Sequence, residues 1–389
     1  MRGKGTAVLL VFLLIMMFSS CEFEKTQENE ENNEIITLTI ALRSGVSGAL
    51  QDMKNEFERD NPDIKLKFIE LSSGFEQYSF MKSSFLTEER LFDVAEIEDV
   101  WVDDFIEKKW LLPVDIFDEI DDGYFDFVKD CFARNSVSYA IPFEMNLGMY
   151  FSLKQFGWNG EYSSPASGEG SLSSNGLKIY DDKEAAECSV IELVNYTGGD
   201  IREALRLYRE IYRFGEDDRI DRNEFKNGNI PIIHSWSSEI PALYQDSSKV
   251  VAALKIHNTP IGRSNRETTV AKVFGLSISS LTPYREECEK LLRYFADDDV
   301  QIKFVLNSGT YPMKERFYDN DTIAVTWSYI PAMKERVKNV NLRPHRRQYA
   351  ERALKLNEDI FSFIIRDKSE DATVAAVTEF MNGGGMAEQ

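Results

Sequence analysis

The feature that most constrains the fold of this chain is the regular alternation of strand-like and helix-like patterns near its beginning. A run rich in β-branched residues is followed by apolar residues at helical spacing and then by alternating apolar and charged residues, and the order repeats. The segments are, in order, Ile35–Leu42, 47–61, 64–68, 75–86 and Asp93–Ile97. Because consecutive parallel strands need a crossover between them, this order predicts an α/β fold with a mostly parallel, doubly wound sheet.

The third of these strands is followed directly by polar and aromatic residues. Glu98, Asp99 and Trp101 form a short turn before a helical segment that carries Phe105. Open α/β sheets place their ligands at the carboxyl ends of their strands. We therefore expect this turn to form one wall of a binding cleft.

Later segments extend the pattern with further strands and helices. Residues 139–151 read as two short apolar strands with a polar interruption, as expected where a chain leaves one sheet and enters another. An amphipathic helix is predicted over 200–214, with Asp200 as its cap. A strand is predicted over 250–254 and a helix over 322–340.

The N-terminus has the layout of a secretory signal. Arg2 and Lys4 precede an apolar run too short for a comfortable membrane span, so residues 1–20 are interpreted as a signal peptide. The run ends at Cys21 after small residues, as in the bacterial lipobox. We expect Cys21 to be lipidated, the alternative being an ordinary signal peptide with a chance cysteine. Residues 21–34 are polar and charged and should form a flexible tether between a bilayer anchor and the folded body.

The charge and the reactive residues of the chain argue against several classes of function. Its formal net charge is −21, which opposes nucleic-acid binding because phosphate contacts need a basic surface. With Cys21 lipidated, the other cysteines (Cys131, Cys188 and Cys288) could form at most one disulfide, and they lack the spacing of a zinc site. The few histidines also lack metal-ligand spacing and give no basis for a catalytic triad. The sequence thus predicts no metal and no cofactor.

Five short motifs follow one another in an order that resembles a known family. They are DVAEIEDVWVDDFIEKKWLLPVD (93–115), YAIPFEMNLGMYF (139–151), FKNGNIPIIHSW (225–236), VFGLSIS (273–279) and NSGTYPMKE (307–315). This order resembles the lipid-anchored extracellular solute-binding proteins of ABC importers, in particular the sugar-binding group that includes maltose-binding protein. The resemblance covers nearly everything after the tether. It implies a protein that captures a ligand and delivers it to a membrane permease without chemistry.

The same resemblance implies a two-lobed, periplasmic-binding-protein-like fold. Each lobe would be a mostly parallel sheet flanked by helices, and hinge strands would join the two. The N-terminal lobe would comprise residues 35–141 and 260–314, and the C-terminal lobe residues 142–259 and 315–389. Ligand would bind between the lobes and close them. The implied protein is a monomer that faces the extracellular or periplasmic side of the cell membrane.

Carried over position by position, the resemblance implies ligand contacts from several places in the chain. They are Arg43, Ser44, Glu98, Asp99, Trp101, Glu144, Asn146, Trp236 and Tyr311. Carboxylates and amides suit paired sugar hydroxyls, and aromatic rings suit the apolar face of a pyranose. Trp236 is the strongest candidate because serines flank it, with a core tryptophan as the alternative. Where the family usually has a threonine-tryptophan-acid helix, this chain has a glycine- and serine-rich segment at 156–176.

The abundant carboxylates leave other functions to be weighed. Two spaced carboxyl groups suffice for glycoside hydrolysis, but no pair lies in an otherwise apolar setting, so an enzyme is not expected. Glu98, Asp99 and Glu144 would also suit a cationic ligand such as a polyamine, or a peptide. A lipoprotein that presents its ligand to a membrane sensor instead of a permease is a further alternative. The favoured interpretation is capture of a mono- or oligosaccharide for an ABC permease.

Overall fold

The computed structural model describes residues 35–72, 74–115, 123–157, 178–181, 185–214, 222–244, 251–263, 265–345 and 347–382. The predicted signal peptide, Cys21, the tether and most of the 156–176 segment lie outside the described residues. The described residues from Thr37 onward form one compact unit. Within the described ranges, no helix is both long and apolar enough to cross a membrane.

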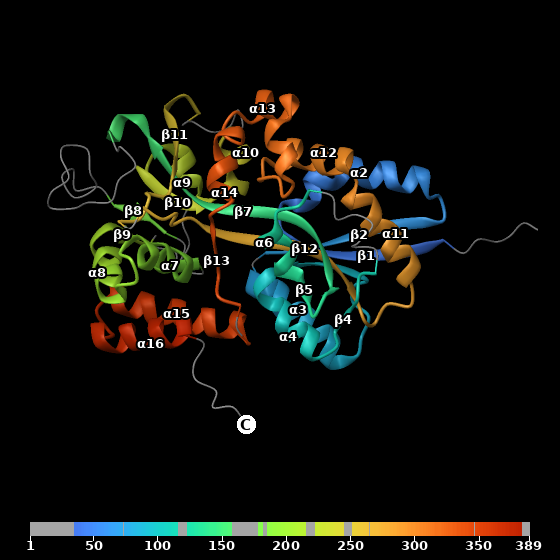
Figure 1. Cartoon of the computed structure of the whole chain (residues 1–389), viewed down its shortest axis with the longest axis horizontal. Helices are drawn as coiled ribbons and strands as arrows, with labels where there is room; N and C mark the ends of the chain where they lie inside the picture. The colour runs from blue at the N-terminus through green and yellow to red at the C-terminus, as the bar shows by residue number, and fades with distance from the viewer. Residues whose placement is uncertain are drawn as a thin grey trace, which may run out of the picture. The chain divides into compact units, whose positions relative to one another are not determined.

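The N-terminal part of the sheet follows the predicted alternation. In chain order its elements are β1 (Ile36–Arg43), α2 (Val46–Asp60), β2 (Ile64–Leu71), α3 (Gly74–Thr87) and β3 (Val94–Glu98). The strands lie in the order β2-β1-β3, and β1 and β3 are parallel, with Ile40 opposite Val94 (Figure 1). The apolar residues at helical spacing in α2 form its buried side. The α/β prediction is confirmed for this part of the chain.

Two long strands, β7 (Ala140–Leu153) and β12 (Val270–Ser279), carry the sheet from its N-terminal to its C-terminal part (Figure 1). β12 is antiparallel to β3 and to the first half of β7. The second half of β7 is antiparallel to β10 (Ile232–Trp236) and β11 (Leu254–Asn258). The prediction of two short strands at 139–151 is wrong, because β7 is one continuous strand of 14 buried residues. Its polar residues do not interrupt it because side chains from other elements bind them.

The C-terminal part of the sheet continues from β10 through β8 (Ile179–Tyr180) to β9 (Tyr212–Arg213). β8 is parallel to both of its neighbours. Beside these strands, α7 (Ala186–Tyr196) packs against α8 (Ile201–Ile211). Asp200 caps α8 as predicted, since its carboxylate accepts a hydrogen bond of 2.9 Å from the backbone N–H of Glu203. The sheet as a whole is mixed, with its antiparallel pairs at β7 and β12.

Short elements connect these parts. They are α4 (Val102–Glu107), β4 (Leu111–Leu112), α6 (Asp126–Phe132), β5 (Ala133–Arg134), β6 (Val137–Ser138), α9 (Arg222–Asn227) and α10 (Ile240–Leu243). The predicted strand at 250–254 is displaced: a 3-10 turn occupies Val251–Ala253 and β11 begins at Leu254.

The last part of the chain is mainly helical. Its helices are α11 (Arg285–Ala296), α12 (Asp298–Ser308), α13 (Asp321–Thr326), α14 (Lys334–Val337), α15 (Tyr349–Ile364) and α16 (Glu370–Asn382). The single helix predicted over 322–340 is wrong, since α13 ends before Trp327, whose indole N–H donates to the backbone carbonyls of Val305 and Leu306 at 3.1 Å. Pro331 starts a separate 3-10 turn before α14. β13 (Asn341–Leu342) then joins the sheet parallel to β12.

The lobe boundaries stay a prediction. Contacts between the described helices bear on where these boundaries lie. α15 and α16 lie beside α7 and α8 (Figure 1). α13 and Trp327 instead contact α12, which the prediction assigns to the N-terminal lobe. The segment between α12 and β13 is therefore the part of the assignment that most needs a test.

The described cysteines play no covalent structural role. Cys131, Cys188 and Cys288 are all buried and free, so no disulfide joins them.

Candidate ligand-binding site

Arg43 lies at the end of β1 and joins two buried carboxylates. Its Nε lies 3.2 Å from Glu96 and its Nη2 lies 2.5 Å from Glu144, while its guanidinium sits 4.1 Å above the Phe274 ring. Burial raises the pKa of Glu96 to about 7, against the opposing effect of the Arg43 charge. One guanidinium thus holds two carboxylates, one of which takes up a proton near neutral pH.

Asn146 extends this network toward the C-terminal part of the sheet. Its amide N–H donates to Glu144, and its amide oxygen accepts from the Ser237 hydroxyl at 3.0 Å and from the Ser238 backbone N–H at 2.9 Å. These serines directly follow Trp236, at the end of β10. The structure therefore brings three predicted contacts, Arg43, Glu144 and Asn146, into one chain of hydrogen bonds that ends beside a fourth.

The Trp236 side chain is only half-buried, unlike most aromatic residues of the sheet. The ammonium group of Lys272 lies 4.2 Å from the centre of its ring. Lys272 itself lies opposite Asn146 in the pairing of β12 with β7. Trp236 thus has the exposure and the position of a stacking surface at the edge of the network.

A second buried ion network surrounds Arg343, which follows β13. Its Nη1 donates to Glu98 at 2.5 Å and its Nη2 to Asp99 at 2.8 Å. His345 Nε2 lies 2.8 Å from the other oxygen of Asp99. Burial alone would raise the pKa of Asp99, but the charge of Arg343 and the hydrogen bond with His345 lower it below its usual range. Glu98, the last residue of β3, and Asp99, which follows it, are thus both bound by the Arg343 guanidinium.

Several buried polar atoms close to Arg343 have no hydrogen-bond partner among the described residues. They are Glu187 Oε2, Arg343 Nε and the Tyr349 hydroxyl. The Arg343 guanidinium lies 5.5 Å from the Tyr349 ring centre, and burial together with the charge of Glu187 raises the Tyr349 pKa. Each of the three residues is at least nine-tenths buried. Buried polar groups normally have partners, so each of these three atoms needs a hydrogen-bond partner that the described side chains do not supply.

Residues 43–302 match the family described as bacterial extracellular solute-binding protein. The chain belongs to this family. The family is one of binding proteins, and no curated protein sequence matches the chain significantly.

Solved structures of two-lobed binding proteins share the fold of this solute-binding protein. They include maltose-bound T. maritima MalE3 (TM-score 0.77, 16% identity, covering 89% of this chain and 99% of that chain). A solute-binding protein of Agrobacterium radiobacter K84 in complex with ribitol has a TM-score of 0.74 (16% identity, 89% and 98% coverage). UgpB from Mycobacterium tuberculosis in complex with glycerophosphocholine has a TM-score of 0.72 (14% identity, 88% and 97% coverage). At these identities the likeness establishes the two-lobed α/β fold and leaves the ligand to the site itself.

The remaining predicted contacts of the solute-binding protein lie outside these networks. Trp101 is buried against Tyr78, with ring centres 5.7 Å apart, and Tyr311 is buried against Tyr329 at 5.8 Å. Ser44 is exposed, and its backbone N–H donates to the Leu71 carbonyl at 2.9 Å. In this structure the two aromatic residues contact protein side chains, and their roles as ligand contacts remain proposals.

Sequence reasoning missed Glu96, Glu187, Arg343 and Tyr349. Glu96 and Glu187 lie among other acids and Tyr349 is one of many tyrosines, so no local pattern marks these three. Arg343 does carry a signal, because it opens a basic stretch at 343–347 in a strongly acidic chain. Such a stretch, in a chain with this excess of carboxylates, predicts a partner for buried acids.

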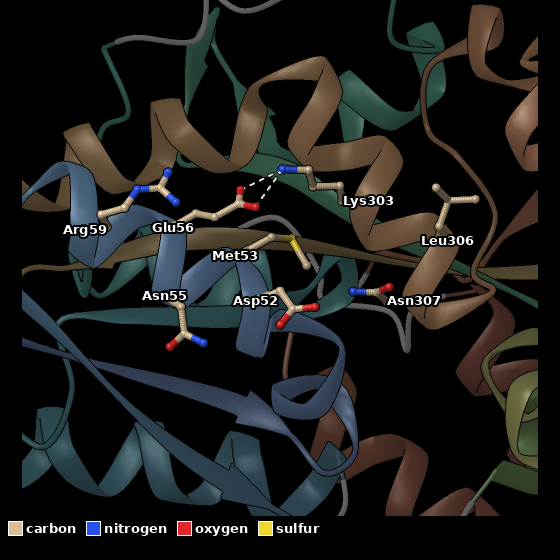
Figure 2. A pocket seen from close by; sticks show the side chains of 8 residues that line it. All are labelled: Asp52, Met53, Asn55, Glu56, Arg59, Lys303, Leu306 and Asn307. Atoms are coloured by element: carbon tan, nitrogen blue, oxygen red, sulfur yellow. Dashed lines mark hydrogen bonds and ion pairs between the residues drawn. The ribbon is translucent and has the colours of Figure 1, made fainter.

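A surface hollow of about 610 Å³ lies between α2 and α12 (Figure 2). Lys303 reaches across it from α12 to Glu56 on α2 at 2.7 Å. None of the predicted contacts lines it; its lining residues are Asp52, Met53, Asn55, Glu56, Arg59, Lys303, Leu306 and Asn307. The ion pair across this hollow involves two of its polar lining residues, Glu56 and Lys303.

Proposed function

We propose that this solute-binding protein captures a neutral carbohydrate, a mono- or oligosaccharide, between its lobes and delivers it to an ABC permease. The observation that carries the proposal is the group of unpartnered atoms at Glu187, Arg343 and Tyr349. A carboxylate oxygen accepts hydrogen bonds, a guanidinium N–H donates them, and a phenol hydroxyl can do both. A sugar hydroxyl also does both, so neighbouring hydroxyls can satisfy all three atoms. Trp236 offers the aromatic face that a pyranose ring needs.

The charges around the site favour a neutral ligand over a cationic one. Glu96 and Glu144 share Arg43, and Glu98 and Asp99 share Arg343. The acids predicted to suit a polyamine, Glu98, Asp99 and Glu144, are therefore already paired, whereas Glu187 keeps one oxygen without a partner among the described residues. Two solved structures of similar fold contain maltose and ribitol, and by analogy they support the same ligand class. The UgpB structure instead contains glycerophosphocholine, a phosphodiester, so a ligand of that kind should be included in any binding test.

We further propose that residues 1–20 direct secretion and that acylated Cys21 anchors the protein, as a monomer, to the outer side of the cell membrane. The sequence layout supports this proposal. Two or three acyl chains would hold the protein stably, since each buried methylene contributes about 0.8 kcal/mol. Residues 21–34 would then give the binding lobes freedom to reach a permease.

Isothermal titration calorimetry with a panel of ligands tests the ligand class. The panel should contain maltose-type oligosaccharides, sugar alcohols, glycerophosphocholine and spermidine. We expect a neutral carbohydrate to bind with micromolar affinity or better, which corresponds to about −8 kcal/mol. Binding of spermidine alone would overturn the neutral-ligand proposal. Recovery of the bound sugar unchanged would support capture, whereas turnover would identify an enzyme.

A further inference from the structure

Three potential metal ligands of different chemical type lie together beside the Arg343 network. One ligand atom each from Asp99, Cys131 and His345 lies within 4.8 Å of the other two. Asp99 belongs to the turn after β3, Cys131 to α6 and His345 to the segment after β13. Asp99 and Cys131 are fully buried, and the His345 side chain is 23% exposed. The sequence predicts no metal site because these residues come from three distant segments.

The two oxygens of Asp99 have different environments. Oδ1 accepts from Arg343 Nη2 at 2.8 Å and from the Val273 backbone N–H at 3.4 Å. Oδ2 lies 2.8 Å from His345 Nε2. Arg343 and Val273 therefore fix the orientation of the carboxylate through one oxygen, as outer-shell partners of metal-binding carboxylates do, while the other oxygen faces the imidazole.

The described hydrogen bond of the Cys131 thiol is local to its own helix. Its described hydrogen bond is to the Phe127 carbonyl of its own helical turn, at 3.2 Å. That carbonyl is four residues earlier in the chain, so the bond is local to the start of α6. Turning the sulfur toward Asp99 and His345 breaks this one weak bond.

The charges around the three residues suit a divalent cation. Arg343 is shared between Glu98 and Asp99, which leaves one net negative charge. Arg134, the other nearby cation, is paired with Asp103 at 2.5 Å. Loss of the thiol proton on metal binding adds a second negative charge, and the charge of Asp130 also acts on the thiol, so the surroundings are negative and suit a divalent cation.

We propose that Asp99, Cys131 and His345 form a binding site for Zn²⁺. Carboxylate oxygen, thiolate sulfur and imidazole nitrogen are the donors that zinc takes in proteins, in tetrahedral geometry with a water as the fourth ligand. Tetrahedral zinc needs its donors about 3.5 Å apart, which small side-chain rotations reach from the present spacing. On binding, the thiol proton passes to solvent and the His345 ring proton sits on Nδ1. The bound ion would fasten the segment after β13 to the turn after β3 and to α6.

Cobalt titration of the purified full chain tests this site directly. The chain is kept reduced, stripped of metal with a chelator and dialysed before Co²⁺ is added. We expect one Co²⁺ per chain, a thiolate-to-cobalt charge-transfer band in the near ultraviolet, and loss of that band when Zn²⁺ is added. Absence of the band in the unsubstituted chain would overturn the proposal.

Variants assign the ligands. Cys131→Ser should abolish the charge-transfer band, and His345→Gln should weaken Zn²⁺ binding at least about tenfold while keeping a hydrogen bond to Asp99. Cys188→Ser and Cys288→Ser remove equally buried thiols and should keep the band. A band that survives Cys131→Ser, or that is lost only with Cys288→Ser, would refute the assignment. If Cys131→Ser does not fold, His345→Gln serves as the test, because His345 is partly exposed. Unchanged Zn²⁺ affinity in His345→Gln would refute the site.

Discussion

Replacing Tyr349 with phenylalanine removes one buried oxygen and leaves the ring in place. The Tyr349 hydroxyl has no partner among the described residues, so its removal breaks no hydrogen bond within them. The free energy of unfolding without ligand should therefore stay the same or rise by about 1 kcal/mol, since an unpaired buried polar group is costly. If a sugar hydroxyl pairs with this phenol, affinity should fall about tenfold, equivalent to about 1.4 kcal/mol.

Tyr318→Phe is the matched control for this substitution. Tyr318 is equally buried, but its hydroxyl donates to the Pro312 carbonyl at 2.9 Å. Its removal should lower the free energy of unfolding by about 1 to 3 kcal/mol and leave ligand affinity unchanged. Urea unfolding without ligand and calorimetry with the best ligand of the panel measure both quantities. Wild-type affinity in Tyr349→Phe, or a loss of stability as large as that of Tyr318→Phe, would refute the reasoning.

Other substitutions test separate parts of the proposal. Trp236→Ala is expected to weaken carbohydrate binding at least about tenfold in calorimetry with little change in folding, and unchanged affinity would remove Trp236 from the site. Cys21→Ser should shift the protein from the membrane to the soluble fraction, and continued membrane retention would contradict the lipid anchor. His234 is buried, but the charge of Glu192 and a hydrogen bond with Asp181 raise its pKa from 6.5 to about 10. Its contribution to stability should be complete below pH 6.5 and disappear as pH rises through about 10, at about 1.4 kcal/mol per pKa unit, and His234→Gln should flatten this dependence in urea titrations.

The elements that the sequence predicts well are those whose pattern is local. The order from β1 to β3 follows from β-branched runs and helical spacing within short windows, and the cap of α8 follows from two residues three positions apart. The failure at β7 has a tertiary cause. Glu144 is satisfied by Arg43, 101 residues away, and Asn146 by Ser237, 91 residues away. A polar residue in an apolar run looks like an interruption when its partner cannot be seen.

The residues of the candidate site also fall into those that the sequence could predict and those that it could not. Arg43, Glu144 and Asn146 could be named from the family resemblance, which indicates positions along the chain but not the contacts between them. Glu187 and Tyr349 could not be found, since a single acid at a helix start and a single tyrosine are common in any such chain. Their importance comes from burial without partners, which depends on the packing of α7 against α15.

The occupied carboxylates determine what the site can select. A cationic ligand that took Glu98 or Asp99 from Arg343 would leave a guanidinium buried without a partner. Breaking a buried ion pair by removing one member costs about 3 to 5 kcal/mol, and the ligand would have to supply that free energy before gaining any affinity. A polyol that binds the unpartnered atoms of Glu187, Arg343 and Tyr349 displaces no ion pair and meets no such cost. Selectivity against an organic cation at Glu98 and Asp99 therefore follows from their pairing with Arg343, even though the strongly acidic composition taken alone would suggest the opposite.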